Sequence, residues 1–288
     1  MPPRRIAILG LGLIGASLGL ALRRTPSAPS VVGFDPDQAT VEWALRNGAI
    51  DRSARSAMET VRDADTVVLA APVRAIMELL GSLAPGLAEG ALVTDTGSTK
   101  AQIVAAAGQL PDRVAFVGGH PLAGRLRSGV GGPDAQLFVG SVYCLTPTSD
   151  TPAWALERAS ALVQSVGATP HLVDAGQHDA ILAAVSHLPY FAAATLVASV
   201  MSQGEWPAMS QLAAGGFRTA TSLVEASDEM WTDVALTNRE PLLRQLDALI
   251  ETLGVLRGLV SLGDADKISD LLTRAHRLHG EWLRSREG

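Results

Sequence analysis

The sequence is poor in cysteine, lysine and aromatic residues. Its single cysteine, Cys144, cannot form a disulfide within the chain. Cys144 lies in an apolar, strand-like run at 141–145, so we expect a buried, unreactive thiol rather than a nucleophile. Only two lysines are present, Lys100 and Lys267, which leaves few candidates for lysine-based chemistry.

A net positive charge is also lacking. The formal net charge is −6, and 18% of the residues are charged. This balance argues against nucleic acid or an anionic membrane surface as the main partner. An anionic substrate would therefore need a local group of arginines. The 47% hydrophobic content over 288 residues predicts a soluble globular protein with a substantial core and room for two domains.

Long membrane-spanning or targeting segments are not expected. Residues 1–5 leave no room for a signal peptide before the first apolar run, which predicts a cytoplasmic protein. The most apolar stretch, 181–200, contains Ser186, His187, Pro189 and Tyr190, which suits a buried helix better than a lipid-facing one.

A glycine motif opens the chain. The apolar run 6–9 leads into Gly10, Gly12 and Gly15, the spacing of a dinucleotide-binding turn followed by a helix. Gly10 would permit the tight turn, Gly12 the approach of backbone N–H groups to a pyrophosphate, and Gly15 close packing of helix and strand. Leu13 and Ile14 would border the same cofactor.

Asp35 lies twenty residues beyond Gly15, at the end of a second apolar run. A carboxylate there can accept hydrogen bonds from an adenosine ribose and would repel a 2′-phosphate, so NAD is favoured over NADP. The alternative is that the glycines only punctuate a turn and that Asp35 caps the next helix.

Alternation of strands and amphipathic helices in the first half predicts an α/β fold with a doubly wound parallel sheet. Strands are expected at 5–9, 31–34, 66–71, 91–94, 114–117, 141–146 and 169–173. Helices are expected at 13–24, 37–47, 73–83, 99–108 and 152–166. From about Gly176 only helical periodicity remains, with breaks at 204–207, 214–216, 241 and 263–264.

The expected domains are thus a dinucleotide-binding domain, 1–174, and an all-helical domain, 175–288. The helix expected at 242–262 has apolar residues on more than one face, which predicts a homodimer formed through the helical domain.

Three loops follow expected strands and should meet at one edge of the sheet. Ala71, Pro72 and Val73 form a loop of small residues. Residues 95–100 contain Ser98 and Lys100, and residues 118–124 place His120 after two glycines. We expect these loops to converge where a nicotinamide ring would lie.

At these residues the chain resembles the prephenate and arogenate dehydrogenases of tyrosine biosynthesis. The similar segments span nearly the whole chain: GLGLIGASL at 10–18, DTGSTK at 95–100, GGHPLAG at 118–124, SHLPY at 186–190, GGFR at 215–218 and SDEMWTDVALTN at 227–238. The resemblance implies hydride transfer to NAD from C4 of a cyclohexadienol, with loss of the ring carboxylate as CO2. No metal is implied.

The resemblance also assigns roles. It makes His120 the acceptor of the C4 hydroxyl proton, and Ser98 a group that orients this hydroxyl and the nicotinamide amide. His120 could instead be a strand-end histidine bonded to backbone. Lys100 would contact substrate or only begin a helix.

Three further residues are substrate-binding candidates. His187 would face the substrate or be a satisfied core histidine. Arg218 could bind a carboxylate through a bidentate fork. Trp231 corresponds to a tryptophan near a dimer-related active site, although simple core packing explains it equally.

Two departures from the family pattern occur together. Members commonly carry Thr-Glu after the HPxAG loop and an arginine four residues after the GGF-(Arg/Lys) basic position. Here Arg125 and Leu126 occupy the loop, and Ser222 occupies the arginine position. Losing both partners avoids an unpaired buried charge. We expect Arg125, with Arg218, to hold the side-chain carboxylate, unless Arg125 and Arg127 are only solvated loop charges.

Other activities remain as alternatives. A β-hydroxyacid dehydrogenase would use a helix lysine, but residues 173–217 contain no lysine. An NAD-binding regulator would not need His120 and Ser98 at the nicotinamide. Leu126 in place of the loop glutamate favours prephenate over arogenate or an amino-substituted prephenate, because an ammonium group would gain from an added acid. No separate regulatory domain is expected, so tyrosine would inhibit only by competing with substrate.

Overall fold

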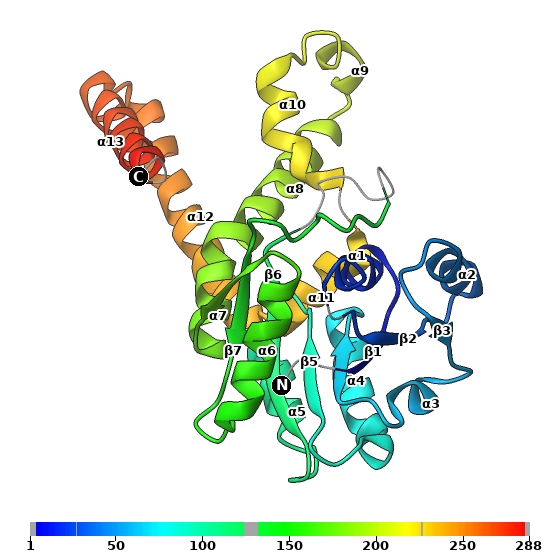
Figure 1. The fold of residues 1–288 in the computed structure, drawn as a ribbon. Helices are drawn as coiled ribbons and strands as arrows, with labels where there is room; N and C mark the ends of the chain where they lie inside the picture. The colour runs from blue at the N-terminus through cyan, green and yellow to red at the C-terminus, as the bar shows by residue number, and fades with distance from the viewer. Residues whose placement is uncertain (1–3, 27, 124–131, 226, 286–288) are drawn as a thin grey trace. The chain divides into compact units, whose positions relative to one another are not determined.

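The structure is a computed structural model that describes residues 4–26, 28–123, 132–225 and 227–285. The chain forms two compact units, Met1–Arg239 and Glu240–Gly288, which we describe separately. The first unit contains the sheet and the first part of the helical region. The second unit contains the last two helices of the chain, apart from the first residue of the earlier one (Figure 1). The boundary expected after residue 174 falls between the last strand and the first helix of the helical region.

An eight-stranded sheet forms the centre of the first unit, in the order β3-β2-β1-β4-β5-β6-β7-β8. The strands are β1 (Arg5–Leu9), β2 (Ser30–Phe34), β3 (Arg52–Ser53), β4 (Thr66–Leu69), β5 (Leu92–Asp95), β6 (Ala115–Pro121), β7 (Val142–Thr146) and β8 (Thr169–Leu172). Strands β1 to β6 are parallel, with β1 between β2 and β4. Winding reverses between β1 and β4, and ligands of such sheets bind beyond the strand ends at this point.

The sheet differs from the expected one in two places. Strand β7 runs antiparallel to β6, pairing Gly119 with Leu145 and His120 with Cys144. A parallel pair needs a long crossover, usually helical, and the described part of the chain between β6 and β7 contains no helix. Strand β3 was not predicted, because two exposed polar residues give no periodic signal.

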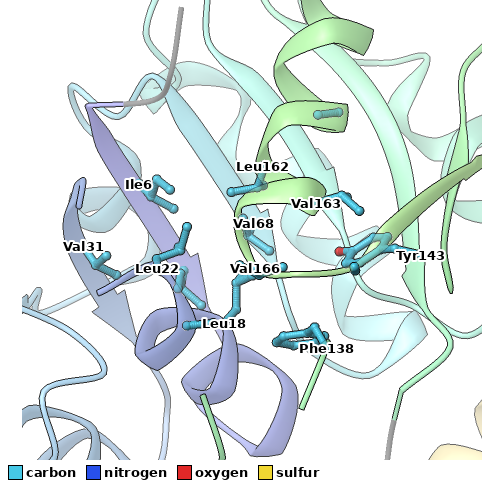
Figure 2. Packing of buried hydrophobic residues seen from close by; sticks show 14 of the residues in the cluster. Ile6, Leu18, Leu22, Val31, Val68, Phe138, Tyr143, Leu162, Val163 and Val166 are labelled. Carbon is cyan, nitrogen blue, oxygen red and sulfur yellow. The ribbon is translucent and has the colours of Figure 1, made fainter. Parts of the chain in front are cut away.

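Helices cover both faces of the sheet. One face is covered by α1 (Leu13–Leu22), α2 (Gln38–Arg46) and α6 (Ala153–Ser165), and the other by α3 (Ala57–Val61), α4 (Val73–Leu83) and α5 (Ala101–Ala107). Figure 2 shows Leu18, Leu22, Leu162 and Val163 beside the strand residue Val68. Burying an aliphatic side chain of this size stabilises the fold by about 1.5–3 kcal/mol. The two apolar faces therefore fix the strand ends that carry the loops.

The helical part of the first unit begins directly after β8. It comprises α7 (Ala175–Leu182), a π-helical turn (Ala183–His187), α8 (Leu188–Met201), α9 (Trp206–Met209), α10 (Gly215–Thr221), a 3₁₀ turn (Ser222–Glu225) and α11 (Asp228–Thr237). Pro189 directly follows the π turn, inside a helical stretch that continues without a break over Ala175–Met201, and a proline inside a helix is a common cause of such a local change in helical geometry.

The stretch Ala175–Met201 is long and apolar enough, by length and composition, to cross a membrane, and no other described helix is. A core helix of a folded domain meets the same criteria. This stretch also carries three buried polar side chains, His178, Asp179 and His187.

The second unit consists of most of α12 (Arg239–Leu262) and of α13 (Ala265–Arg284). Gly263 turns the chain between them with a φ of 67°, and Asp264 caps α13 by accepting from the Lys267 N–H. The break expected at Pro241 was misplaced, because α12 begins at Arg239 and accommodates the proline in its first turn.

Candidate functional site

One large cavity lies at the carboxyl ends of the strands, with a volume of about 1030 Å³. Its walls come from the glycine turn, the loops after β4, β5 and β6, and helices α7, α8 and α11. The lining residues that were predicted from sequence are Gly12, Leu13, Ile14, Ala71, Pro72, Val73, Ser98, His120 and Trp231. The structure therefore brings together the three loops that the strand-end argument placed at one edge of the sheet.

The start of α1 is suited to a pyrophosphate. Gly10 has a φ of 93°, and a Cβ on it would lie 2.2 Å from the Ala70 oxygen. A Cβ on Gly15 would lie 1.9 Å from the Gly10 oxygen, which explains its close packing role. A Cβ on Gly12 would meet nothing within 4 Å, and no side chain caps α1 there. Uncapped N–H groups at a helix start that borders a cavity are an anion-binding arrangement, so these residues fit a dinucleotide.

Asp35 is fixed beside this turn. Its carboxylate accepts from the Leu11 N–H at 2.7 Å and from the Asp37 N–H at 2.9 Å. The cap of α2 is Asp37, which accepts from the Ala39 and Thr40 N–H groups. The alternative role of Asp35 as that helix cap is therefore wrong.

His120 ends a chain of three side chains. Its Nδ1 lies 2.9 Å from His178 Nε2, and His178 Nδ1 lies 2.8 Å from Asp179 Oδ1. Asp179 also accepts the Lys100 N–H at 2.7 Å and the Ala101 N–H at 2.9 Å, at the start of α5. Three donors thus fix the Asp179 carboxylate and, through it, both histidines.

This chain selects the tautomer of His120. A carboxylate that already accepts two backbone N–H groups accepts from His178 Nδ1–H as well, which leaves Nε2 of a neutral His178 as an acceptor. His120 therefore donates from Nδ1, and its Nε2 is left with a free lone pair. Burial lowers the pKa of His120 well below its ordinary value of 6.5, with smaller contributions from His178, Lys100 and His187. The ring is neutral and able to accept a proton.

The structure does not place Lys100 in contact with substrate. Its side chain is fully buried, does not line the cavity, forms an ion pair with Asp95 and donates to the Gly119 oxygen at 2.7 Å. Burial lowers the pKa of Lys100, and the Asp95 charge opposes this. Lys100 also occupies the N-cap position of α5, so the alternative that it begins a helix describes its place.

Asp95 joins two of the cavity loops. Besides Lys100 it accepts from the Gly97 N–H at 2.8 Å and the Gly119 N–H at 3.0 Å. The first donor precedes Ser98 and the second precedes His120, so one buried carboxylate positions both loops.

An aromatic group forms another wall. Trp231 stacks on Tyr190 with ring centroids 3.8 Å apart and an angle of 6° between the planes. Both side chains line the cavity, and Trp231 Nε1 is buried without a hydrogen-bond partner among the described residues. The location of Trp231 is thus compatible with ligand contact as well as with packing.

His187 is buried behind this wall and does not line the cavity. Its Nδ1 lies 3.0 Å from Asn238 Nδ2, and Asn238 Nδ2 also donates to the Asp179 backbone oxygen. Burial lowers the pKa of His187 to about 4. This is the geometry of a satisfied core histidine rather than of a substrate contact.

Of the two candidate arginines, the one that the structure describes, Arg218, does not line this cavity. Arg218 is exposed on α10 and lines a separate pocket of about 220 Å³ with Ala213, Ala214, Gly215 and Phe217. Arg125, with Leu126 and Arg127, lies outside the described residues.

Sequence reasoning missed His178, Asp179 and Asp95. Asp95 had a usable signal, because it ends a buried strand of the sheet. His178 and Asp179 give no local signal, because their role depends on the packing of α7 against the start of α5.

The fold and the cavity together define a nicotinamide-dependent dehydrogenase, with a glycine turn for the dinucleotide and a neutral histidine beside it. Residues 18–172 match the family model "Prephenate dehydrogenase, nucleotide-binding domain", and residues 174–274 match "Prephenate dehydrogenase, dimerization domain". The chain therefore belongs to the prephenate dehydrogenase family.

Individual relatives agree. The chain is 37% identical over 268 residues to a prephenate dehydrogenase of Bacillus subtilis, covering 91% of this chain and 72% of that protein. It is 29% identical to an Aquifex aeolicus prephenate dehydrogenase solved in complex with hydroxyphenyl propionate and NAD+, with a TM-score of 0.89 over 98% and 99% of the two chains. A Synechocystis arogenate dehydrogenase is 30% identical, with a TM-score of 0.81 over 96% and 99%.

Proposed function

We propose that this protein oxidises prephenate with NAD and releases 4-hydroxyphenylpyruvate and CO2, as a step of tyrosine biosynthesis. The observation that carries this proposal is His120, which lines the cavity with Nδ1 engaged by His178 and Nε2 left to accept a proton. A purely NAD-binding regulator would not need this arrangement.

The residues act on one proton and one hydride. NAD supplies the hydride acceptor when it is bound. His120 Nε2 accepts the proton of the C4 hydroxyl as hydride leaves C4, and the ring carboxylate departs as CO2 while the ring becomes aromatic. The resulting imidazolium donates from Nδ1 to His178, and Asp179 stabilises the positive charge through His178. Ser98, on the same cavity wall, orients the hydroxyl.

Prephenate is favoured over arogenate as the substrate. Asp233 is the acidic residue among those lining the described cavity, and it forms an ion pair with Arg74. It therefore offers no free negative charge to the ammonium group of arogenate. Arg125 remains the candidate for the side-chain carboxylate, and an Arg125→Ala variant that binds substrate as tightly as the parent would contradict that role.

A homodimer formed through the helical region is part of this proposal, as is a cytoplasmic location. In the second unit, α12 and α13 expose Ile250, Leu253, Val255, Val260, Leu262, Leu272, Leu278 and Trp282. Apolar residues in this number favour burial against a second copy. Light scattering after size-exclusion chromatography should give twice the mass of the 30.0 kDa chain.

Formation of NADH with prephenate, and separately with arogenate, tests the activity. We expect turnover with NAD and prephenate, with lower kcat/KM for arogenate and for NADP. Equal or greater efficiency with arogenate would reassign the substrate, and binding of NAD without any turnover would favour a regulator.

A further inference from the structure

We propose that the Arg74–Asp233 pair is a positioning contact through which the dinucleotide and the cyclohexadiene substrate promote each other's binding. This inference rests on the proposed function, because it assumes that both ligands occupy the one cavity. It concerns two residues to which the reaction itself gives no role.

The contact joins the start of α4 to the middle of α11. Asp233 Oδ1 accepts from Arg74 Nε at 2.5 Å, and Asp233 Oδ2 accepts from the Arg74 backbone N–H at 3.2 Å. The Asp233 side chain is 2% exposed, whereas that of Arg74 is 57% exposed. One carboxylate thus binds both the side chain and the backbone of the residue that follows the Ala71-Pro72-Val73 loop.

The two ends of this contact belong to different sides of the cavity. Pro72 and Val73 line it beside the glycine turn, where the dinucleotide fits. On α11, Met230 and Trp231 line it together with Asp233 and form the wall beside Tyr190. A ligand that orders one side therefore orders the other through this short connection.

A second connection acts in parallel. Thr237 donates its hydroxyl to the Asp233 backbone oxygen at 2.7 Å, so its oxygen accepts from the Thr99 hydroxyl at 2.8 Å. Both threonine side chains are buried, and Thr99 directly follows Ser98. Helix α11 is consequently bonded to two of the loops that surround the nicotinamide position.

Coupling between two sites is a free energy, and it is reciprocal for binding. In the parent protein NAD+ should strengthen the binding of hydroxyphenyl propionate, a non-reacting probe, by about tenfold, within the usual range for such coupling. Removing the contact should reduce the factor to about two or three, while the affinity for each ligand alone changes less. The kinetic counterpart is a raised KM for both ligands with a smaller change in kcat.

Isothermal titration calorimetry with NAD+ and hydroxyphenyl propionate, alone and together, tests this. The variants are Arg74→Gln, Asp233→Asn, the double variant and Thr237→Val, with Arg74→Lys as the conservative form. Arg46→Gln is the matched control, because Arg46 is an exposed helix arginine that, among the described residues, bonds only to the Glu42 backbone oxygen. We expect weak coupling in Arg74→Gln and Asp233→Asn, little further loss in the double variant, and partial recovery in Arg74→Lys.

Two results would overturn the inference: a parent protein that binds the two ligands independently, or unchanged coupling in both single variants with a normal melting temperature. Absence of prephenate turnover would contradict the proposed function instead, and would leave the binding measurements interpretable.

Discussion

The histidine wall and the aromatic wall of the cavity are built by different means. On the histidine wall, His120, His178 and Asp179 form a continuous series of hydrogen bonds that ends on backbone N–H groups of α5. On the aromatic wall, Tyr190 and Trp231 are held by stacking, and the Trp231 N–H has no partner among the described residues. The first wall is organised by hydrogen bonds, and the second depends on stacking and keeps a buried polar group without a partner among the described residues. Substitutions on the two walls should therefore have different consequences.

The largest effect is expected for His120→Asn. Asparagine cannot accept the proton that hydride transfer releases, and a general base contributes roughly 10²–10⁴-fold to rate. We expect kcat to fall by about 10³-fold, while NAD affinity and melting temperature stay near those of the parent. Steady-state kinetics with prephenate and a separate NAD titration measure both. A variant that retains near-normal kcat would rule out His120 as the base.

Stability should depend on pH through His187. Its pKa is about 4 in the folded protein, because of burial, against an ordinary value of 6.5. A depressed folded pKa means that the unfolded chain binds the proton first, so the free energy of unfolding falls as pH drops from about 6.5 towards 4. The free energy of unfolding should fall by on the order of 3 kcal/mol over this interval. Above pH 7 it should not change through His187.

Urea denaturation at several pH values measures this slope, and His187→Gln is the variant to compare. Glutamine can keep a hydrogen bond with Asn238 and does not titrate. Its stability should be flatter over the same interval, although His120 contributes a slope of the same sign. An identical slope in parent and variant would show that His187 is not the responsible group.

Asp179→Asn should slow the reaction without abolishing it. An amide in place of the carboxylate weakens the donation from His178 and removes the charge that stabilises the imidazolium of His120. We expect kcat to fall by about 30-fold, equivalent to about 2 kcal/mol. The fall should be similar across the pH range in which His120 is neutral, because the ratio of the two tautomers of a neutral imidazole does not depend on pH.

The matched control is Asp174→Asn. Asp174 caps the same helix by accepting from the Gln177 N–H and takes no part in the histidine series. The Asp174→Asn variant should keep a kcat close to that of the parent protein. Equal losses in the two variants would mean that α7 matters only structurally.

The two walls also differ in how far sequence could predict them. The glycine turn, Ser98 and His120 follow strands, and the topology of a doubly wound sheet sends such loops to one edge. The order of strands and loops does not predict which side chains are buried or which of them pair across the fold. The sequence left open whether Lys100 contacts substrate or begins a helix, because the presence of Asp95 in the same segment does not show that the two side chains pair in the core. His178 and Asp179 gain their meaning only when α7 packs against α5.

The aromatic wall gives the smallest effect, in Trp231→Phe. Phenylalanine keeps most of the stacking on Tyr190 but lacks the N–H group that is buried without a partner. An unsatisfied buried donor is costly, so its removal should leave the melting temperature unchanged or slightly raised. Because the Trp231 ring lines the cavity, its replacement by a smaller ring should raise KM for prephenate about five-fold, with little change in kcat. A lower melting temperature with an unchanged KM would instead make Trp231 a packing residue, and the aromatic wall would then be as complete without a ligand as the histidine wall.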